Sequence, residues 1–199
     1  VINEDDITFK DNKNKFDNIK FIFDNVSFID SEKKIIQTSR DKLNYDFLIL
    51  SPGIGYKNNK IQGYSIYDNR NVPHCWDGQS SLSDFKNRLD ALENNSKIII
   101  SSPDYPYRCP PAPYERASLI ANYFKKKKMN VKVLILDSKD SFTKQENFFE
   151  EWRLNYEKII EWIPRNQGGQ VVSYNQSEKS LKNNQGHTFK GDFIHIIPE

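Results

Sequence analysis

Apolar and polar residues alternate with different periods in the two halves of the chain. Between residues 19 and 50 the apolar runs are short, rich in Ile, Phe and Val, and interrupted by turn formers, which predicts a β-meander. A polar, irregular stretch follows at residues 56–81, and beyond it segments with helical spacing alternate with continuous apolar runs. The strands predicted in the first half are Ile19–Phe28, Lys34–Thr38 and Asp46–Leu50.

The second half predicts an α/β unit. Its strand and helix signals alternate, an order that favours a Rossmann-like parallel sheet with flanking helices and a small antiparallel β-meander near the end. This is the layout of a dinucleotide-binding half. The predicted helices are Ser83–Leu92, Tyr114–Lys127 and most of Phe142–Ile160, and the predicted strands are Lys97–Ile100, Val131–Leu136, Ile159–Ile163, Gln170–Tyr174, Thr188–Lys190 and Phe193–Ile197.

Composition excludes several classes of protein. The 199 residues are 37% hydrophobic and 13% aromatic with a net charge of +2, which is typical of a soluble globular chain without a nucleic-acid-binding surface. We expect no transmembrane segment, because no uncharged apolar run approaches the roughly 18 residues that a membrane helix needs. Two cysteines and three histidines without zinc-like spacing predict neither a disulfide scaffold nor a metal site. Because Val1 opens a charged segment and the only Met is Met129, we expect a piece of a longer protein.

The loop after the strand Lys97–Ile100 is unusual for a nucleotide-binding unit. That turn is ordinarily rich in glycine, because a pyrophosphate must approach backbone N–H groups at the start of the next helix. Residues 101–116 contain five prolines and no glycine, and each proline removes one N–H donor. We therefore expect no NAD(P) binding at this turn, and we interpret Asp137 as a remnant of the topology or a cap for the region of Lys139.

The same loop predicts a reactive thiol. Cys109 follows Arg108 and lies a few residues before a predicted helix, and both the cation and the helix N-terminus favour a thiolate suited to thiol–disulfide exchange. The alternative is a buried, inert cysteine. Glu115, in the first turn of that helix, is either a helix-start acid or a proton acceptor beside a redox centre. Pro52 and Gly53 end the first half in a turn, or in a close backbone approach to a ligand.

The run Arg108–Ser118, Arg-Cys-Pro-Pro-Ala-Pro-Tyr-Glu-Arg-Ala-Ser, closely resembles the signature of the flavoprotein subunit of flavocytochrome c sulfide dehydrogenase. The likeness spans nearly the whole chain, although strand-plus-Pro-Gly patterns also occur in related two-domain flavoproteins such as sulfide:quinone oxidoreductases. Supporting matches are Tyr45–Gly53, His74–Trp76, Leu134–Asp140 and Asp192–Pro198.

The resemblance implies a division of the chain into three parts. Residues 1–55 would be the C-terminal part of an FAD-binding domain, residues 56–81 a crossover, and residues 82–199 a central unit that resembles an NAD domain but binds no NAD. Pro52 and Gly53 would lie near the FAD. Cys109 would pair with a cysteine further along the parent protein, and the resulting disulfide would lie against the flavin with Glu115 close by.

The implied activity is the oxidation of hydrosulfide through that disulfide and FAD, with a c-type cytochrome subunit as electron acceptor in the periplasm. The chain departs from the family pattern in lacking the Gly-rich FAD fingerprint, a covalent flavin attachment residue and the partner cysteine, so we expect this piece alone to be inactive. Cys75 is also unexpected, and a Cys75–Cys109 bridge stays open. The alternatives are a quinone as acceptor, as in sulfide:quinone oxidoreductases, or a non-catalytic docking domain in which Cys109 is buried.

Overall fold

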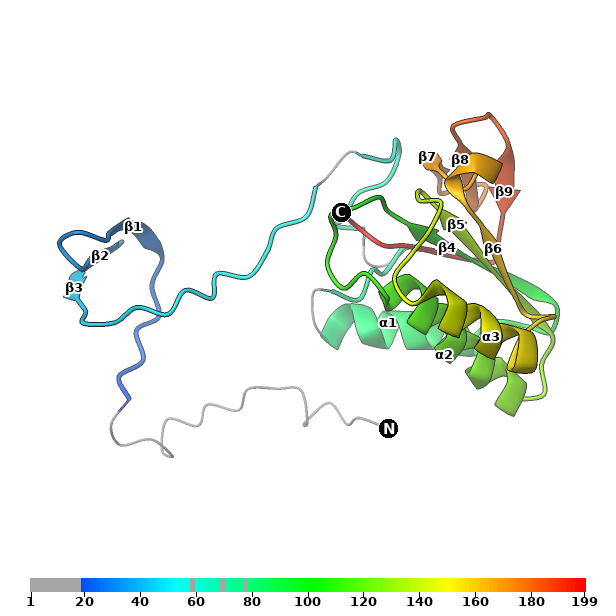
Figure 1. The fold of residues 1–199 in the computed structure, drawn as a ribbon, viewed down its shortest axis with the longest axis horizontal. Coiled ribbons are helices and arrows are strands. Elements are labelled where there is room, and N and C mark those ends of the chain that lie inside the picture. The colour runs from blue at the N-terminus through cyan, green and yellow to red at the C-terminus, as the bar shows by residue number, and fades with distance from the viewer. Residues whose placement is uncertain (1–18, 58–59, 69–70, 77–78) are drawn as a thin grey trace. The chain divides into compact units, whose positions relative to one another are not determined.

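The computed structural model describes residues 19–57, 60–68, 71–76 and 79–199, and the chain divides into two compact units (Figure 1). The first unit is Val1–Gly55 and the second is Tyr56–Glu199. Residues 1–18, which belong to the predicted FAD-domain segment, lie outside the described part. No helix in the described ranges is long and apolar enough to cross a membrane.

The first unit holds one antiparallel sheet of three strands in the order β1, β2, β3. The predicted strand at Asp46–Leu50 is wrong, because the chain reverses earlier: Thr38 N donates to Asp41 O at 2.8 Å, and Asp41 N donates to Thr38 Oγ1 at 2.9 Å. This turn brings a polar segment onto the sheet instead and leaves Asp46–Leu50 irregular. The strands are β1 (Val26–Asp30), β2 (Ile35–Thr38) and β3 (Lys42–Asn44).

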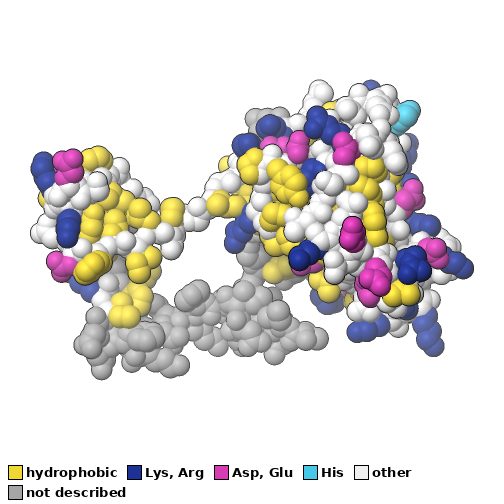
Figure 2. All heavy atoms as spheres, viewed as in Figure 1, with side chains coloured by type: hydrophobic (Ala, Val, Ile, Leu, Met, Phe, Trp, Pro, Cys, Tyr) yellow, Lys and Arg dark blue, Asp and Glu magenta, His cyan; other side chains and the backbone are white. Residues whose placement is uncertain are grey.

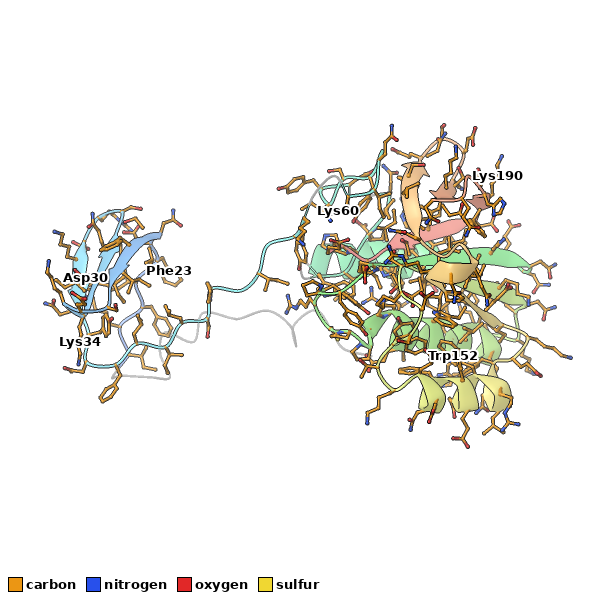
Figure 3. All side chains as sticks on the ribbon, turned by 45° about the horizontal axis from the view of Figure 1, so that its top comes forward. Phe23, Asp30, Lys34, Lys60, Trp152 and Lys190 are labelled. Atoms are coloured by element: carbon orange, nitrogen blue, oxygen red, sulfur yellow. The ribbon has the colours of Figure 1, made fainter. Side chains whose placement is uncertain are left out.

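The first unit leaves many of its described apolar side chains exposed. Figure 2 shows hydrophobic side chains gathered over this unit, and Phe47 and Ile49 are 95% and 90% exposed. Figure 3 labels Phe23, Asp30 and Lys34 in the same unit; Phe23 is also largely exposed, although its carbonyl accepts a 2.6 Å hydrogen bond from Arg40. Apolar exposure on this scale marks a surface that is ordinarily covered.

The second unit is a three-layer α/β domain, as the sequence predicts. Its central sheet is parallel, in the order β10, β4, β5, β6, with three helices on one face and an antiparallel sheet of three strands on the other (Figure 1). The central strands are β4 (Ser96–Ser102), β5 (Val131–Asp137), β6 (Ile160–Ile163) and β10 (Phe193–Ile196). The helices are α1 (Gln79–Asp90), α2 (Ala112–Lys126) and α3 (Gln145–Asn155), and the second sheet is β7 (Val171–Asn175), β8 (Ser180–Asn183) and β9 (Thr188–Lys190), preceded by the 3-10 turn η2 (Arg165–Gln167).

Alternating residues of the central strands point to opposite faces of the sheet, where they pack into two separate apolar clusters. Ile98 and Ile100 of β4 face the helices, where Trp152 lies on the inner side of α3 and donates through Nε1 to Ser118 Oγ of α2 at 2.8 Å (Figure 3). Ile99, between them, faces the antiparallel sheet. Sheets buried on both faces carry continuous apolar runs, which is why β4 and β5 were recognisable in the sequence.

Two parts of the second unit differ from the predicted pattern. The segment 56–81 is not merely a polar connection, because Tyr64, Ile66 and Val72 are buried against the face of the sheet opposite the helices. Strand β8 was missed because its sequence, Ser-Leu-Lys-Asn, is largely polar, whereas the structure buries both Ser180 and Asn183.

Candidate functional site

The proline-rich loop between β4 and α2 is anchored at both ends. Lys139 Nζ donates to the carbonyl oxygen of Pro103 at 2.6 Å, and Tyr107 Oη donates to that of Pro110 at 2.6 Å. The ring of Tyr105 stacks on that of Tyr107 with centroids 5.5 Å apart. Prolines fix φ along the same stretch, so the loop has few alternative conformations.

Cys109 is the exposed side chain at the end of this loop. It adopts a φ of 59°, which is uncommon for a residue other than glycine, and its carbonyl accepts a hydrogen bond from Ala112 N at 2.9 Å as α2 begins. Cys109 and Cys75 form no disulfide. The exposure of Cys109 contradicts the burial that a non-catalytic docking domain predicts.

Arg116 of α2 packs against the turn that contains Cys75. Its guanidinium donates to the carbonyl of His74 at 3.2 Å and lies 4.9 Å from the ring centroid of Trp76, the two residues that flank Cys75. Burial lowers the pKa of Arg116, and the neighbouring Cys75 and Cys109 sulfur groups act against that shift. Sequence reasoning missed Arg116, because its partners His74 and His195 lie far from it in the chain and only the fold brings them to one guanidinium.

His195 of β10 supports Arg116 from the sheet. Arg116 donates to His195 Nε2 at 3.0 Å, so Nδ1 carries the imidazole proton and donates to the carbonyl of Pro73 at 2.8 Å. Complete burial, followed by the charge of Arg116, holds the pKa of His195 well below its usual range. The imidazole is therefore a neutral partner for the guanidinium.

Glu115 lies on another side of α2. Its side chain is exposed and lines a groove of about 490 Å³ between α2 and α3, together with Leu119, Phe148 and Glu151. Arg116, one residue later, contacts His74 and His195 instead. In the described structure Glu115 is thus placed as a helix-start carboxylate near the loop, with no contact that joins it to Cys109.

The carboxyl end of β5, where a dinucleotide ribose would bind, is filled by side chains of the chain itself. Asp137 is completely buried and accepts hydrogen bonds from Lys139 Nζ at 2.6 Å, Tyr114 Oη at 2.6 Å and Trp162 Nε1 at 2.9 Å. Burial lowers the pKa of Lys139 against the raising effect of Asp137, and burial next to that carboxylate raises the pKa of Tyr114. Of the two interpretations of Asp137, the contact with Lys139 supports the second.

Pro52 and Gly53 belong to the first unit, whereas Cys109 and Glu115 belong to the second. Gly53 adopts a φ of 75°, and a Cβ placed on it would meet no atom within 4 Å. Among the described residues, no group of three or more His, Cys, Asp or Glu side chains could hold a metal ion.

Comparison with solved structures shows a shared fold at low identity. The alignment with a ferredoxin reductase from Rhodopseudomonas palustris covers 98% of this chain and 45% of the reductase chain, with a TM-score of 0.56 and 14% sequence identity. The alignment with an NAD-dependent persulfide reductase from A. fulgidus covers 86% of this chain and 30% of that protein, with a TM-score of 0.54 and 16% identity. The alignment with a thioredoxin reductase from Lactococcus lactis covers 82% of this chain and 48% of that protein, with a TM-score of 0.51 and 18% identity. The chain spans less than half the length of each.

Comparison with protein families is more specific. Residues 83–198 match the family described as "Sulfide dehydrogenase (flavocytochrome c) flavoprotein chain, central". The match covers more than half of the chain, including the proline-rich loop, Cys109, Arg116 and the whole parallel sheet. The chain therefore belongs to the family of flavoprotein chains of flavocytochrome c sulfide dehydrogenase.

Proposed function

We propose that the chain is part of an FAD-dependent sulfide dehydrogenase in which Cys109 takes part in the oxidation of hydrosulfide. The observation that carries this proposal is the exposed Cys109, held at the end of the proline-rich loop next to Arg108. A fixed, accessible sulfur beside a positive charge suits thiol–disulfide exchange.

The proposed step requires a disulfide between Cys109 and a second cysteine of the parent protein. Hydrosulfide attacks the sulfur of that second cysteine, the S–S bond breaks, a persulfide forms there, and the bond's electron pair leaves on Cys109 as a thiolate. Arg116 stabilises this negative charge, and Glu115 is proposed to accept or relay the proton. FAD, when bound, supplies the two-electron acceptor for the thiolate.

The domain assignment is part of the same proposal. Residues 1–55 would complete an FAD-binding domain, which would cover the exposed apolar side chains such as Phe47 and Ile49. Pro52 and Gly53 would contact the cofactor through open backbone. We also propose that no NAD binds the second unit. Prolines remove backbone N–H donors from its first strand-to-helix turn, and the Asp137 carboxylate already accepts hydrogen bonds from Tyr114 and Lys139.

We propose a c-type cytochrome subunit as the electron acceptor and the periplasm as the location. The experiment is an anaerobic titration of the full-length protein with sulfide, followed by mixing with either an oxidised c-type cytochrome or a soluble quinone. Loss of oxidised-flavin absorbance with sulfide, and its return with cytochrome, supports the whole proposal. Return with quinone alone indicates a sulfide:quinone oxidoreductase, and a flavin that sulfide does not reduce overturns the proposal.

A further inference from the structure

The backbone of Cys109 is held in a conformation that it would not readily adopt alone. Its φ of 59° lies in the left-handed region, which is unfavourable for a residue with a Cβ and persists where the surrounding structure enforces it. Two hydrogen bonds close on this residue from its C-terminal side. Ala112 N donates to the Cys109 carbonyl at 2.9 Å, and Tyr107 Oη donates to the Pro110 carbonyl at 2.6 Å. The second of these depends on a side chain, the hydroxyl of Tyr107.

Tyr107 is itself fixed by the body of the second unit. Its ring is buried in the apolar cluster on the helix side of the sheet, and it stacks on the ring of Tyr105 at a centroid distance of 5.5 Å. Lys139 Nζ lies 4.8 Å from the centroid of the Tyr107 ring, and the buried Asp137 accepts a 2.6 Å hydrogen bond from that ammonium. The hydroxyl of Tyr107 therefore has a fixed position relative to β5, and it transmits that position to the carbonyl one residue after Cys109.

We propose that Tyr107 is a positioning residue for the Cys109 thiol: its hydroxyl, through the Pro110 carbonyl, keeps Cys109 in the left-handed conformation and so sets the direction of the sulfur. The inference rests on the proposed function and deepens it, because it names a residue that acts on the reaction through Cys109. Without the hydroxyl, Cys109 gains access to negative φ values, which rotate its Cβ and sulfur about the N–Cα bond. A reacting group displaced by about 1 Å can lose up to about 100-fold in rate.

The test is anaerobic stopped-flow reduction of the flavin in the full-length protein over a series of sulfide concentrations. Tyr107→Phe removes the hydroxyl and keeps the buried ring. The matched control is Tyr105→Phe, because Tyr105 is 47% exposed and its hydroxyl makes no hydrogen bond in the described part of the chain.

We expect Tyr107→Phe to lower the limiting rate of flavin reduction about tenfold or more, while the half-saturating sulfide concentration changes less than about twofold. The reason is that, in the proposed reaction, Cys109 delivers the electron pair to the flavin after sulfide has reacted with the second cysteine. Tyr105→Phe should match the wild type in both quantities.

A limiting rate of Tyr107→Phe that equals that of Tyr105→Phe overturns the inference. Cys109→Ser separates this failure from a failure of the proposed function. If sulfide reduces Cys109→Ser at the wild-type rate, the proposed function fails, whereas an inert Cys109→Ser beside a fully active Tyr107→Phe removes the positioning role alone.

If Tyr107→Phe does not fold, as judged by circular dichroism, the same substitution in a Cys109→Gly background decides, because glycine adopts positive φ without strain. Recovery of the fold in the double variant supports the inference, since the hydroxyl is then no longer needed to hold position 109. A double variant that stays unfolded contradicts it.

Discussion

Asp137 and Lys139 form a buried ion pair where related α/β domains bind a nucleotide ribose. The Lys139 side chain is 4% exposed and donates to Ser102 Oγ and the Pro103 carbonyl as well as to Asp137. Such a pair is costly to break, because the remaining charge has no solvent and no counterion. The pair therefore ties the end of β5 to the loop that carries Cys109.

Lys139→Met should destabilise the chain by about 3–5 kcal/mol, since it leaves the Asp137 carboxylate buried with neutral partners alone. Urea unfolding measures the change. Lys132→Met, at an exposed position of β5, is the matched control and should lower the free energy of unfolding by less than about 0.5 kcal/mol. Equal stability of the two variants would show that the pair contributes nothing.

His195 predicts a pH dependence of stability. Its folded-state pKa is lowered by burial and by the facing Arg116 and His74, so the native imidazole stays neutral while the unfolded one gains a proton below about pH 6.5. The stabilisation is complete above that pH and is lost as the pH falls, by at most about 1.4 kcal/mol per unit. The unfolding free energy of the wild-type chain should fall more steeply between about pH 6.5 and 5 than that of His195→Gln. Parallel curves would count against this assignment.

At the residue scale, the sequence predicted the character of the proline-rich loop but not the tertiary contacts of Arg116 behind it. Five prolines and Cys109 lie close together within residues 101–116, so the effect of the prolines on the backbone could be argued from the local sequence. The contacts of Arg116 with His74 and His195 depend on the packing of α2 against β10 and the turn after Val72, which no local pattern reveals. Whether Glu115 relays a proton stays a prediction.

At the scale of elements, the apolar strands inside the parallel sheet and the short β9 were predicted correctly, whereas the apolar runs at residues 19–25 and Asp46–Leu50 form no strand. β4 and β5 carry continuous Ile, Leu and Val, because both of their faces are buried. β3 and β8 are short and polar, and their pairing depends on turns and neighbouring strands rather than on their own composition. The third strand was therefore placed at Asp46–Leu50, and β8 was missed.

Gly169 is the point where the antiparallel sheet joins the parallel one. A Cβ there would overlap the carbonyl oxygen of Ile163 and lie 2.6 Å from that of Asp137. We expect Gly169→Ala to destabilise the chain by about 1–3 kcal/mol, because backbone atoms of β5 and β6 would have to move. Thermal unfolding tests this against Gly55→Ala, where a Cβ meets no atom within 4 Å. A Gly169 variant as stable as that control would contradict the tight junction.

At the scale of the whole molecule, the two units differ in how complete they are. The second unit has two buried apolar clusters on the faces of its sheet, whereas the first exposes most of the apolar side chains that the structure describes there. The α/β fold and the family were both recognisable from the sequence, because the fold follows from apolar periodicity and the family from the run around Cys109. We propose that FAD-domain packing covers the exposed apolar side chains of the first unit.

The central claim is that the sulfur of Cys109 carries the oxidation of hydrosulfide. The most direct measurement is anaerobic stopped-flow reduction of the flavin by sulfide in the full-length protein and in Cys109→Ser, with dithionite reduction as a control for a competent flavin. The account predicts that Cys109→Ser keeps its flavin and is reduced by dithionite, but is not reduced by sulfide on the timescale of the wild type. Sulfide-dependent reduction at a rate near that of the wild type would contradict it.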